Sequence, residues 1–187
     1  MLEFFPLTKE RWKDFELLFG PRGACGGCWC MWWKLSRREF GAGQYEGNRL
    51  AQKAFVAKGG IPGLLAYVDR RPSGWCAVEP RDRYPLLARS RILAPIDDQP
   101  VWSVTCFYVD KSARRQGLST ALLRAVIDHV SEHGGKIVEG YPTEPRPGSK
   151  IVTTFVYTGL ASTFRRIGFK EVARRSETRP IMRYTIR

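Results

Sequence analysis

The sequence contains no apolar run long enough to cross a lipid bilayer, which takes about 20 residues in a helix. Its first stretch, MLEFFPLTKERWKDFELLFG, also lacks the uncharged core of a secretory signal, because charged side chains interrupt it. No long polar linker divides the 187 residues, a length that suits one domain with its own core. We therefore expect a single soluble domain over residues 1–187, located in the cytoplasm.

Cysteine and histidine are too few to predict a metal centre. The five cysteines form an odd number, which argues against a disulfide framework in a chain with no signal peptide. Cys25 and Cys28 have the spacing of a zinc knuckle, but no second pair supplies the rest of a four-ligand set. The only histidines, His129 and His133, lie near the end of an expected helix, where histidine is electrostatically favoured. We predict no metal site.

Acidic residues are also scarce. Asp and Glu number 18 against 31 Lys and Arg, which gives a formal net charge of +13. Such a charge favours an anionic partner: a nucleic acid, an anionic surface or a phosphorylated small molecule. A nucleic-acid-binding protein is therefore one hypothesis, although the charges are spread along the chain and no helix-turn-helix signature is present. The Gly-x-x-x-x-Gly-Lys-Ser/Thr phosphate loop is absent.

Strand and helix patterns alternate along the chain, which predicts a mixed α/β domain. The stretch VWSVTCFYVD is the strongest expected strand, because β-branched and aromatic residues crowd it. Strands are expected at 2–8, in a hairpin at 63–80, and at 101–110, 135–142, 170–176 and 181–187; helices are expected at 9–19, 37–58, 117–133 and 159–169.

The junction after the strongest strand has the features of an anion site. Its residues, Arg114 to Ser119, lie where a helix leaves its first backbone N–H groups unpaired. These groups and the helix dipole favour an anion, and Gly117 lets a ligand approach the backbone with no Cβ in the way. The two arginines add positive charge, so that a pyrophosphate would fit this turn.

The same junction resembles the acetyl-CoA-binding motif of the GNAT superfamily of acetyltransferases, Arg/Gln-x-x-Gly-x-Gly/Ala between a core strand and a helix. Here the motif reads from Arg114 to Ser119, with serine as its last small residue. A second resemblance is the closing helix that ends in Gly168-Phe169 before a strand. The likeness covers residues 63–187, and residues 1–60 would form the variable part on the acceptor side.

The resemblance implies a mixed, mostly antiparallel sheet with helices on both faces. Its middle strands, SVTCFYVD and KIVEGYP, would splay apart so that the pantetheine arm of acetyl-CoA, the co-substrate, lies between them. The implied cofactor contacts are backbone groups: those of Phe107, Tyr108 and Val109 for the arm, and those of Arg114, Arg115, Gln116, Gly117, Leu118, Ser119 and Thr120 for the pyrophosphate.

The implied reaction is direct transfer of an acetyl group to an amine, which needs a general base because a protonated amine cannot attack. Glu139 occupies a position that several relatives use for the base, and Glu79 is a second candidate. The family's usual acid is a tyrosine on the closing helix, but here Phe164 stands at that position. Tyr157 or a water molecule would have to protonate the departing thiolate.

The acceptor is not specified by the sequence. Trp29, Trp32 and Trp33 lie in the expected acceptor-side segment, where they would line a pocket for a ring or a cation, or else form a core patch. A small-molecule amine and a peptide amine both stay open, as does a homodimer. Because of Phe164, a catalytically inactive domain that binds CoA is a further alternative.

Overall fold

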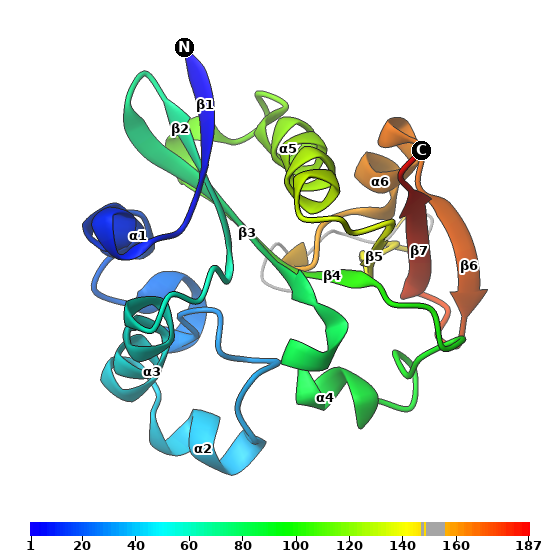
Figure 1. Ribbon diagram of the computed structural model, residues 1–187, viewed down its shortest axis with the longest axis horizontal. Coiled ribbons are helices and arrows are strands. Elements are labelled where there is room, and N and C mark those ends of the chain that lie inside the picture. Colours follow the sequence, from blue (N-terminus) through cyan, green and yellow to red (C-terminus); the bar gives the residue numbers. More distant parts are fainter. Residues whose placement is uncertain (147, 149–155) are drawn as a thin grey trace.

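The computed structural model describes residues 1–146, 148 and 156–187 and shows one seven-stranded sheet (Figure 1). The strand order is β1-β2-β3-β4-β5-β7-β6, and every pairing except that of β4 with β5 is antiparallel. The expected mixed, mostly antiparallel sheet is confirmed. The strands are β1 (Leu2–Pro6), β2 (Gly63–Val68), β3 (Arg71–Pro80), β4 (Trp102–Val109), β5 (Ile137–Gly140), β6 (Lys170–Arg174) and β7 (Pro180–Thr185).

The helices agree with the sequence patterns apart from two differences. The expected helix at 37–58 is two helices, because the chain turns at Gly43 to Tyr45, where Tyr45 has φ +69°. A short helix that was not expected follows β3 and begins with a proline at its first position. The helices are α1 (Trp12–Phe19), α2 (Arg37–Ala42), α3 (Glu46–Ala57), α4 (Pro85–Ala88), α5 (Leu118–Glu132) and α6 (Ala161–Ile167).

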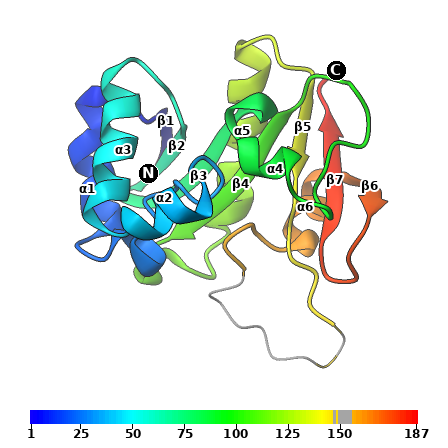
Figure 2. The same ribbon diagram turned by 90° about the horizontal axis from the view of Figure 1, so that it is seen from below.

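Helices cover both faces of the sheet because the strand residues alternate in direction. On β2 and β3, Leu64, Ala66, Cys76 and Val78 pack against the buried side of α5, while their neighbours Leu65, Tyr67, Trp75 and Ala77 pack against α1. Figures 1 and 2 show α5 and α6 separated by the sheet from α1, α2 and α3. In the described part of the chain no helix is long and apolar enough to span a membrane.

The two middle strands are paired over only part of their length. The parallel pairing of β4 with β5 joins Trp102 to Val138, Ser103 to Glu139 and Val104 to Gly140, where β5 ends. Strand β4 continues to Val109, and a shift in its register with β3 leaves Thr105 as a bulge residue just beyond the last paired position. The predicted splay of these strands is confirmed, and the bulge lies where it begins.

Candidate active site

The edge of β4 that faces the splay is defined by its backbone hydrogen bonds. The Phe107 N–H donates to the Tyr157 carbonyl at 2.5 Å, so this residue's backbone groups point away from β3. Backbone direction alternates along a strand, and the Asp110 N–H donates to Ser73 on β3 at 2.9 Å. Tyr108, two residues before Asp110, therefore directs its backbone groups toward β3. This corrects the expectation that Tyr108 binds the pantetheine arm through its backbone.

The predicted anion site lies at the start of α5. Gly117 is the N-cap residue with φ +80°, and a Cβ built on it meets nothing within 4 Å, so the space over its backbone is open. The preceding turn is fixed by its own side chains: Arg114 Nε donates to the Val109 carbonyl at 3.0 Å and Gln116 Nε2 to the Ser112 carbonyl at 2.9 Å. Arg115 is exposed beside this turn, with φ +63°. The turn can present positive charge and unhindered backbone to an anion.

Not every N–H of the predicted motif is available at this helix start. The Thr120 N–H donates to the Gly117 carbonyl at 2.9 Å. The Leu118 side chain is buried under the sheet, whereas Ser119 is half-buried. Because the first N–H groups of a helix have no partner within the helix, those of Leu118 and Ser119 are the ones best placed for a phosphate.

Glu139, the first candidate base, lies in a buried network of charged side chains. Its carboxylate accepts hydrogen bonds from Arg81 Nη1 at 2.8 Å, from Arg183 Nε at 2.7 Å and from the Tyr141 hydroxyl at 2.6 Å. The residue is 1% exposed. Both of its oxygens are already bound, so this carboxylate fastens β5 to β7 and to the turn after β3.

Glu79, the second candidate, has a different environment. It pairs in register with Ser103, which pairs in turn with Glu139, so all three side chains lie on the face opposite α5. Its one charged partner among the described residues is Lys34, with which it forms a buried ion pair. Burial raises the pKa of Glu79, against the opposing effect of Lys34, and burial lowers the pKa of Lys34. Both pKa values, that of Glu79 and that of Lys34, are therefore shifted toward neutral pH.

Aromatic rings surround this ion pair. The Lys34 ammonium lies 3.9 Å from the centre of the Phe55 ring and 5.7 Å from that of Tyr84. Burial raises the pKa of Tyr84 well above its usual value. Glu79 pairs in register with Ser103, two residues before the bulge at Thr105, so the ion pair is close to the point where β4 and β5 separate. Sequence analysis missed Lys34, although a single lysine directly after the aromatic run CMWW was a detectable signal.

Tyr157 and Phe164 have clearly different positions. Phe164 is fully buried, 6.1 Å from Phe107 and 4.9 Å from Phe169 between ring centres, so the customary acid position belongs to the core. Tyr157 is half-buried beside β4, and burial raises its pKa while the charges of Arg179 and Arg37 oppose that effect. Its hydroxyl therefore keeps its proton at neutral pH.

The three tryptophans do not form one lining. Trp29 is a core residue, 3% exposed and stacked on Phe19 at 5.6 Å. Trp32 is half-buried, with the Arg37 guanidinium 3.4 Å from its ring centre. Trp33 packs against the cluster that contains Tyr84 and Tyr141. Trp33 is therefore near the end of β5, and Trp29 is not.

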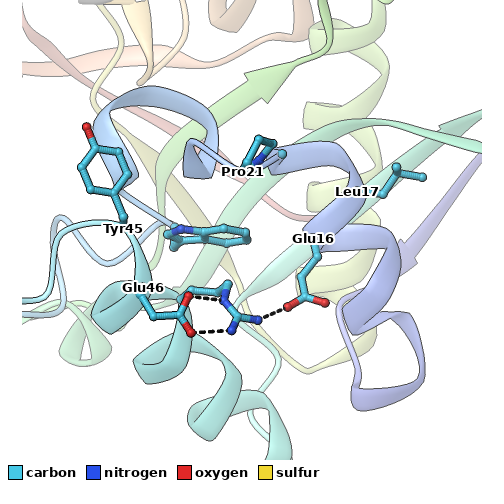
Figure 3. Close-up of a pocket in the computed structure, with 8 residues that line it drawn as sticks. Glu16, Leu17, Pro21, Tyr45 and Glu46 are labelled. Atoms are coloured by element: carbon cyan, nitrogen blue, oxygen red, sulfur yellow. Dashed lines mark hydrogen bonds and ion pairs between the residues drawn. The ribbon is translucent and has the colours of Figure 1, made fainter.

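A separate open pocket of about 470 Å³ lies between α1 and α3 (Figure 3). The Arg49 guanidinium crosses its floor, bound by Glu46 and Glu16. Trp29 is the one predicted substrate residue that borders it; the remaining lining residues are Leu17, Gly20, Pro21 and Tyr45. Glu79, Glu139 and Tyr157 do not line this pocket.

One cluster of side chains on α5 and directly after it bears on the predicted absence of a metal site. In the described ranges, His129, Glu132 and His133 are the only His, Cys, Asp or Glu residues that bring three ligand atoms within 4.8 Å of one another. His129 is buried against Trp102 and burial lowers its pKa, while His133 Nδ1 lies 2.8 Å from the His129 carbonyl. His129 therefore packs against Trp102 and His133 contacts the last turn of α5, and the absence of a metal site stays a prediction.

The sequence of the chain matches one known protein family. Residues 29–146 match the sequence profile described as the acetyltransferase (GNAT) family, which confirms the resemblance seen in the sequence. No curated protein sequence matches the chain significantly.

Solved structures share the fold at low sequence identity. The PaiA N-acetyltransferase from Thermoplasma acidophilum, in complex with coenzyme A, is 14% identical with a TM-score of 0.54, over 100% of this chain and 99% of that one. A GNAT-family acetyltransferase from Streptococcus agalactiae is 12% identical with a TM-score of 0.58, over 100% and 96%. A protein from Desulfovibrio desulfuricans described as a GNAT-family acetyltransferase is 15% identical with a TM-score of 0.53, over 99% of each chain.

Proposed function

Because this chain belongs to the acetyltransferase (GNAT) family, we propose that it transfers the acetyl group of acetyl-CoA directly to an amine. The observation that carries the proposal is the alignment of two features: a bulged β4 that parts from β5, and an open helix start at Gly117 reached directly from β4. A CoA molecule has an anionic pyrophosphate and an amide-containing arm, so it needs an anion site beside a free strand edge.

The cofactor would be held mainly by backbone groups. The N–H groups of Leu118 and Ser119, with the dipole of α5 behind them, would bind the pyrophosphate, and Arg115 would add charge. The arm would lie along the edge of β4 that carries the backbone groups of Phe107 and Val109. The Phe107 N–H already donates to the Tyr157 carbonyl and the Val109 carbonyl accepts from Arg114, so the arm would use the Phe107 carbonyl and the Val109 N–H.

We assign the general base to Glu79 rather than Glu139. The Glu139 carboxylate already accepts three hydrogen bonds, from two arginines and a tyrosine, whereas the ion-pair partner of Glu79 among the described residues is Lys34 alone. Glu79 has the raised pKa that a base near neutral pH requires, and its lysine partner is itself less basic through burial. The carboxylate would accept the proton of the incoming ammonium group, after which the neutral amine attacks the thioester carbonyl.

Tyr157 is the proposed acid. Its protonated hydroxyl belongs to a residue whose carbonyl is bonded to the Phe107 N–H of β4. In that position it can donate a proton to the CoA thiolate as the C–S bond breaks. A thiol with a pKa near 8.5 is already a fair leaving group, so water can replace this residue in part.

The test is release of free CoA thiol from acetyl-CoA across a panel of small-molecule and peptide amines, combined with calorimetric measurement of CoA binding. We expect CoA binding and turnover with at least one amine. Absence of CoA binding would contradict the site. CoA binding without turnover on any amine, together with no effect of Glu79→Gln on acetyl-CoA hydrolysis, would favour the inactive CoA-binding alternative.

A further inference from the structure

Four of the five cysteines gather on the face of the sheet opposite α5. Cys25, Cys28 and Cys30 lie in the loop after α1, and Cys106 lies on β4 directly after the bulge residue. The Cys30 and Cys106 sulfur atoms are 3.5 Å apart, although 76 residues separate them in the chain. The spacing of the cysteines in the sequence did not show which other cysteine the loop thiols contact. The fold shows that Cys30 contacts Cys106.

The loop is built to turn Cys30 toward the sheet. Trp29 and Cys30 have φ values of +42° and +60°, a region that non-glycine residues rarely adopt. A Cβ on Gly23 would lie 2.3 Å from the Trp29 indole nitrogen, so that only glycine allows the indole to fold back under the loop. The buried Trp75 then donates its indole N–H to the Cys30 sulfur at 2.8 Å. Cys30 is thus fixed between the loop and β4.

Cys28 and Cys30 differ in reactivity. A hydrogen bond with Cys30 is the main factor that lowers the pKa of Cys28 to about 6, against the effect of burial. Because this pKa lies below 7, Cys28 is mostly a thiolate at neutral pH, and the thiolate is the form that reacts. The Cys28 side chain is half-buried. Burial raises the pKa of Cys30 well above its usual value, and contacts with Cys106 and Cys28 add to this. Cys28 suits a first nucleophile, and Cys30 suits a second, resolving thiol.

The arrangement of the sulfurs is that of a row. Cys30 interacts with Cys28 on one side and with Cys106 on the other. Yet no three cysteines in the described residues have their sulfur atoms within 4.8 Å of one another, as the ligands of one metal ion would be. The Cys30 sulfur contacts that of Cys106, and Cys28 lies two residues before Cys30 with its thiol at 3.6 Å from the Gly23 carbonyl. This order suits the passage of a disulfide from Cys28–Cys30 to Cys30–Cys106.

We propose that Cys28, Cys30 and Cys106 form a thiol oxidation site that reacts with hydroperoxides and ends as a Cys30–Cys106 disulfide. The Cys28 thiolate attacks the terminal peroxide oxygen, the O–O bond breaks, and Cys28 becomes a sulfenic acid as water or an alcohol leaves. The Cys30 thiol attacks the Cys28 sulfur, and a second water leaves. The Cys106 thiol then attacks the Cys30 sulfur, gives up its proton, and releases Cys28, again as a thiolate. One peroxide is reduced and two thiols lose their hydrogens.

The last exchange has a clear direction. A thiol with a lowered pKa is the better leaving group in thiol–disulfide exchange, and the pKa of Cys28 is lowered to about 6. A disulfide between Cys28 and Cys30 would also span only one intervening residue, Trp29, which already has a left-handed φ. The Cys30–Cys106 bond instead joins the loop to β4, between segments whose sulfurs are already in contact. This chemistry is independent of acetyl transfer.

The experiment maps disulfides in the whole protein. Fully reduced protein is treated with one equivalent of hydrogen peroxide, free thiols are blocked with N-ethylmaleimide, and the chain is cut with trypsin and then chymotrypsin. The second enzyme is needed because Trp29 is the only cleavage point between Cys28 and Cys30. We expect a Cys30–Cys106 peptide pair, with the blocking group on Cys25, Cys28 and Cys76. A different pair, or no disulfide, would overturn the proposal, and so would a stoichiometric metal in the reduced protein.

Variants separate the roles of the three thiols. Cys106→Ser should stop the relay at a Cys28–Cys30 disulfide, and Cys28→Ser should slow peroxide consumption at least about tenfold at neutral pH, since a low-pKa thiolate is lost. Cys76→Ala is the matched control, because Cys76 is buried on the α5 face of the sheet and should leave oxidation unchanged. Equal rates for Cys28→Ser and the control would refute the assignment of the first nucleophile.

Discussion

Replacing Glu139 with glutamine distinguishes a structural carboxylate from a catalytic one. The substitution keeps the shape of the side chain but removes the negative charge shared by Arg81 and Arg183, while Arg183 keeps Asp97 at 2.6 Å. Removing one partner of a buried ion pair costs about 3–5 kcal/mol. Because Arg183 keeps this second carboxylate, we expect the lower end, about 3 kcal/mol.

For a chain of this length, that loss corresponds to a fall in Tm of about 6–12 °C. Differential scanning calorimetry measures this fall, and free-thiol release at a temperature well below the transition measures kcat. We expect Glu139→Gln to lose the stated stability and to keep kcat within about threefold, because its carboxylate is already held by two arginines and a tyrosine in a structural network.

The matched control is Glu177→Gln, which breaks an exposed ion pair with Arg146. Exposed pairs contribute little, so its Tm should change by no more than about 2 °C. The reasoning is refuted if Glu139→Gln leaves Tm unchanged and lowers kcat by about a hundredfold, since that result describes the general base that the family resemblance implied.

Three further outcomes test the proposed site. Glu79→Gln should lower kcat by about 10²-fold. Because burial raises the pKa of Glu79, the wild-type rate should fall as pH drops through that pKa, and this acidic limb should vanish in the variant. An unchanged pH profile would exclude Glu79 as the base. Gly117→Glu should weaken CoA binding at least about tenfold in calorimetry, because the new carboxylate occupies the helix start that would attract the pyrophosphate. The control is Gly134→Glu, at the other end of α5 with similar φ and open space, which should bind CoA normally. Equal losses in the two variants would contradict the pyrophosphate assignment. Tyr157→Phe should reduce kcat about tenfold because water can protonate the thiolate; a complete loss would mean that the hydroxyl has another role.

The sequence by itself determined the features that depend on neighbouring residues. A strand rich in β-branched and aromatic residues, followed at once by Gly117 and an apolar-striped helix, predicted β4, α5 and an open helix start, and all three are present. These features follow from local backbone preferences and from the periodicity of apolar residues. The splay of β4 from β5 was predicted through the family resemblance and is confirmed by the register.

Only the tertiary structure decided which side chains are free to react. Glu139 was a plausible base until Arg81 and Arg183, 58 and 44 residues away in the chain, were seen to bind both of its oxygens. Lys34 and Cys106 gained their importance in the same way: Lys34 meets Glu79, and Cys106 meets Cys30, although these residues are distant in the chain. Burial and charged partners set the pKa of a side chain, and both come from segments that local sequence patterns do not relate. Reactivity at this site is therefore a property of the folded chain.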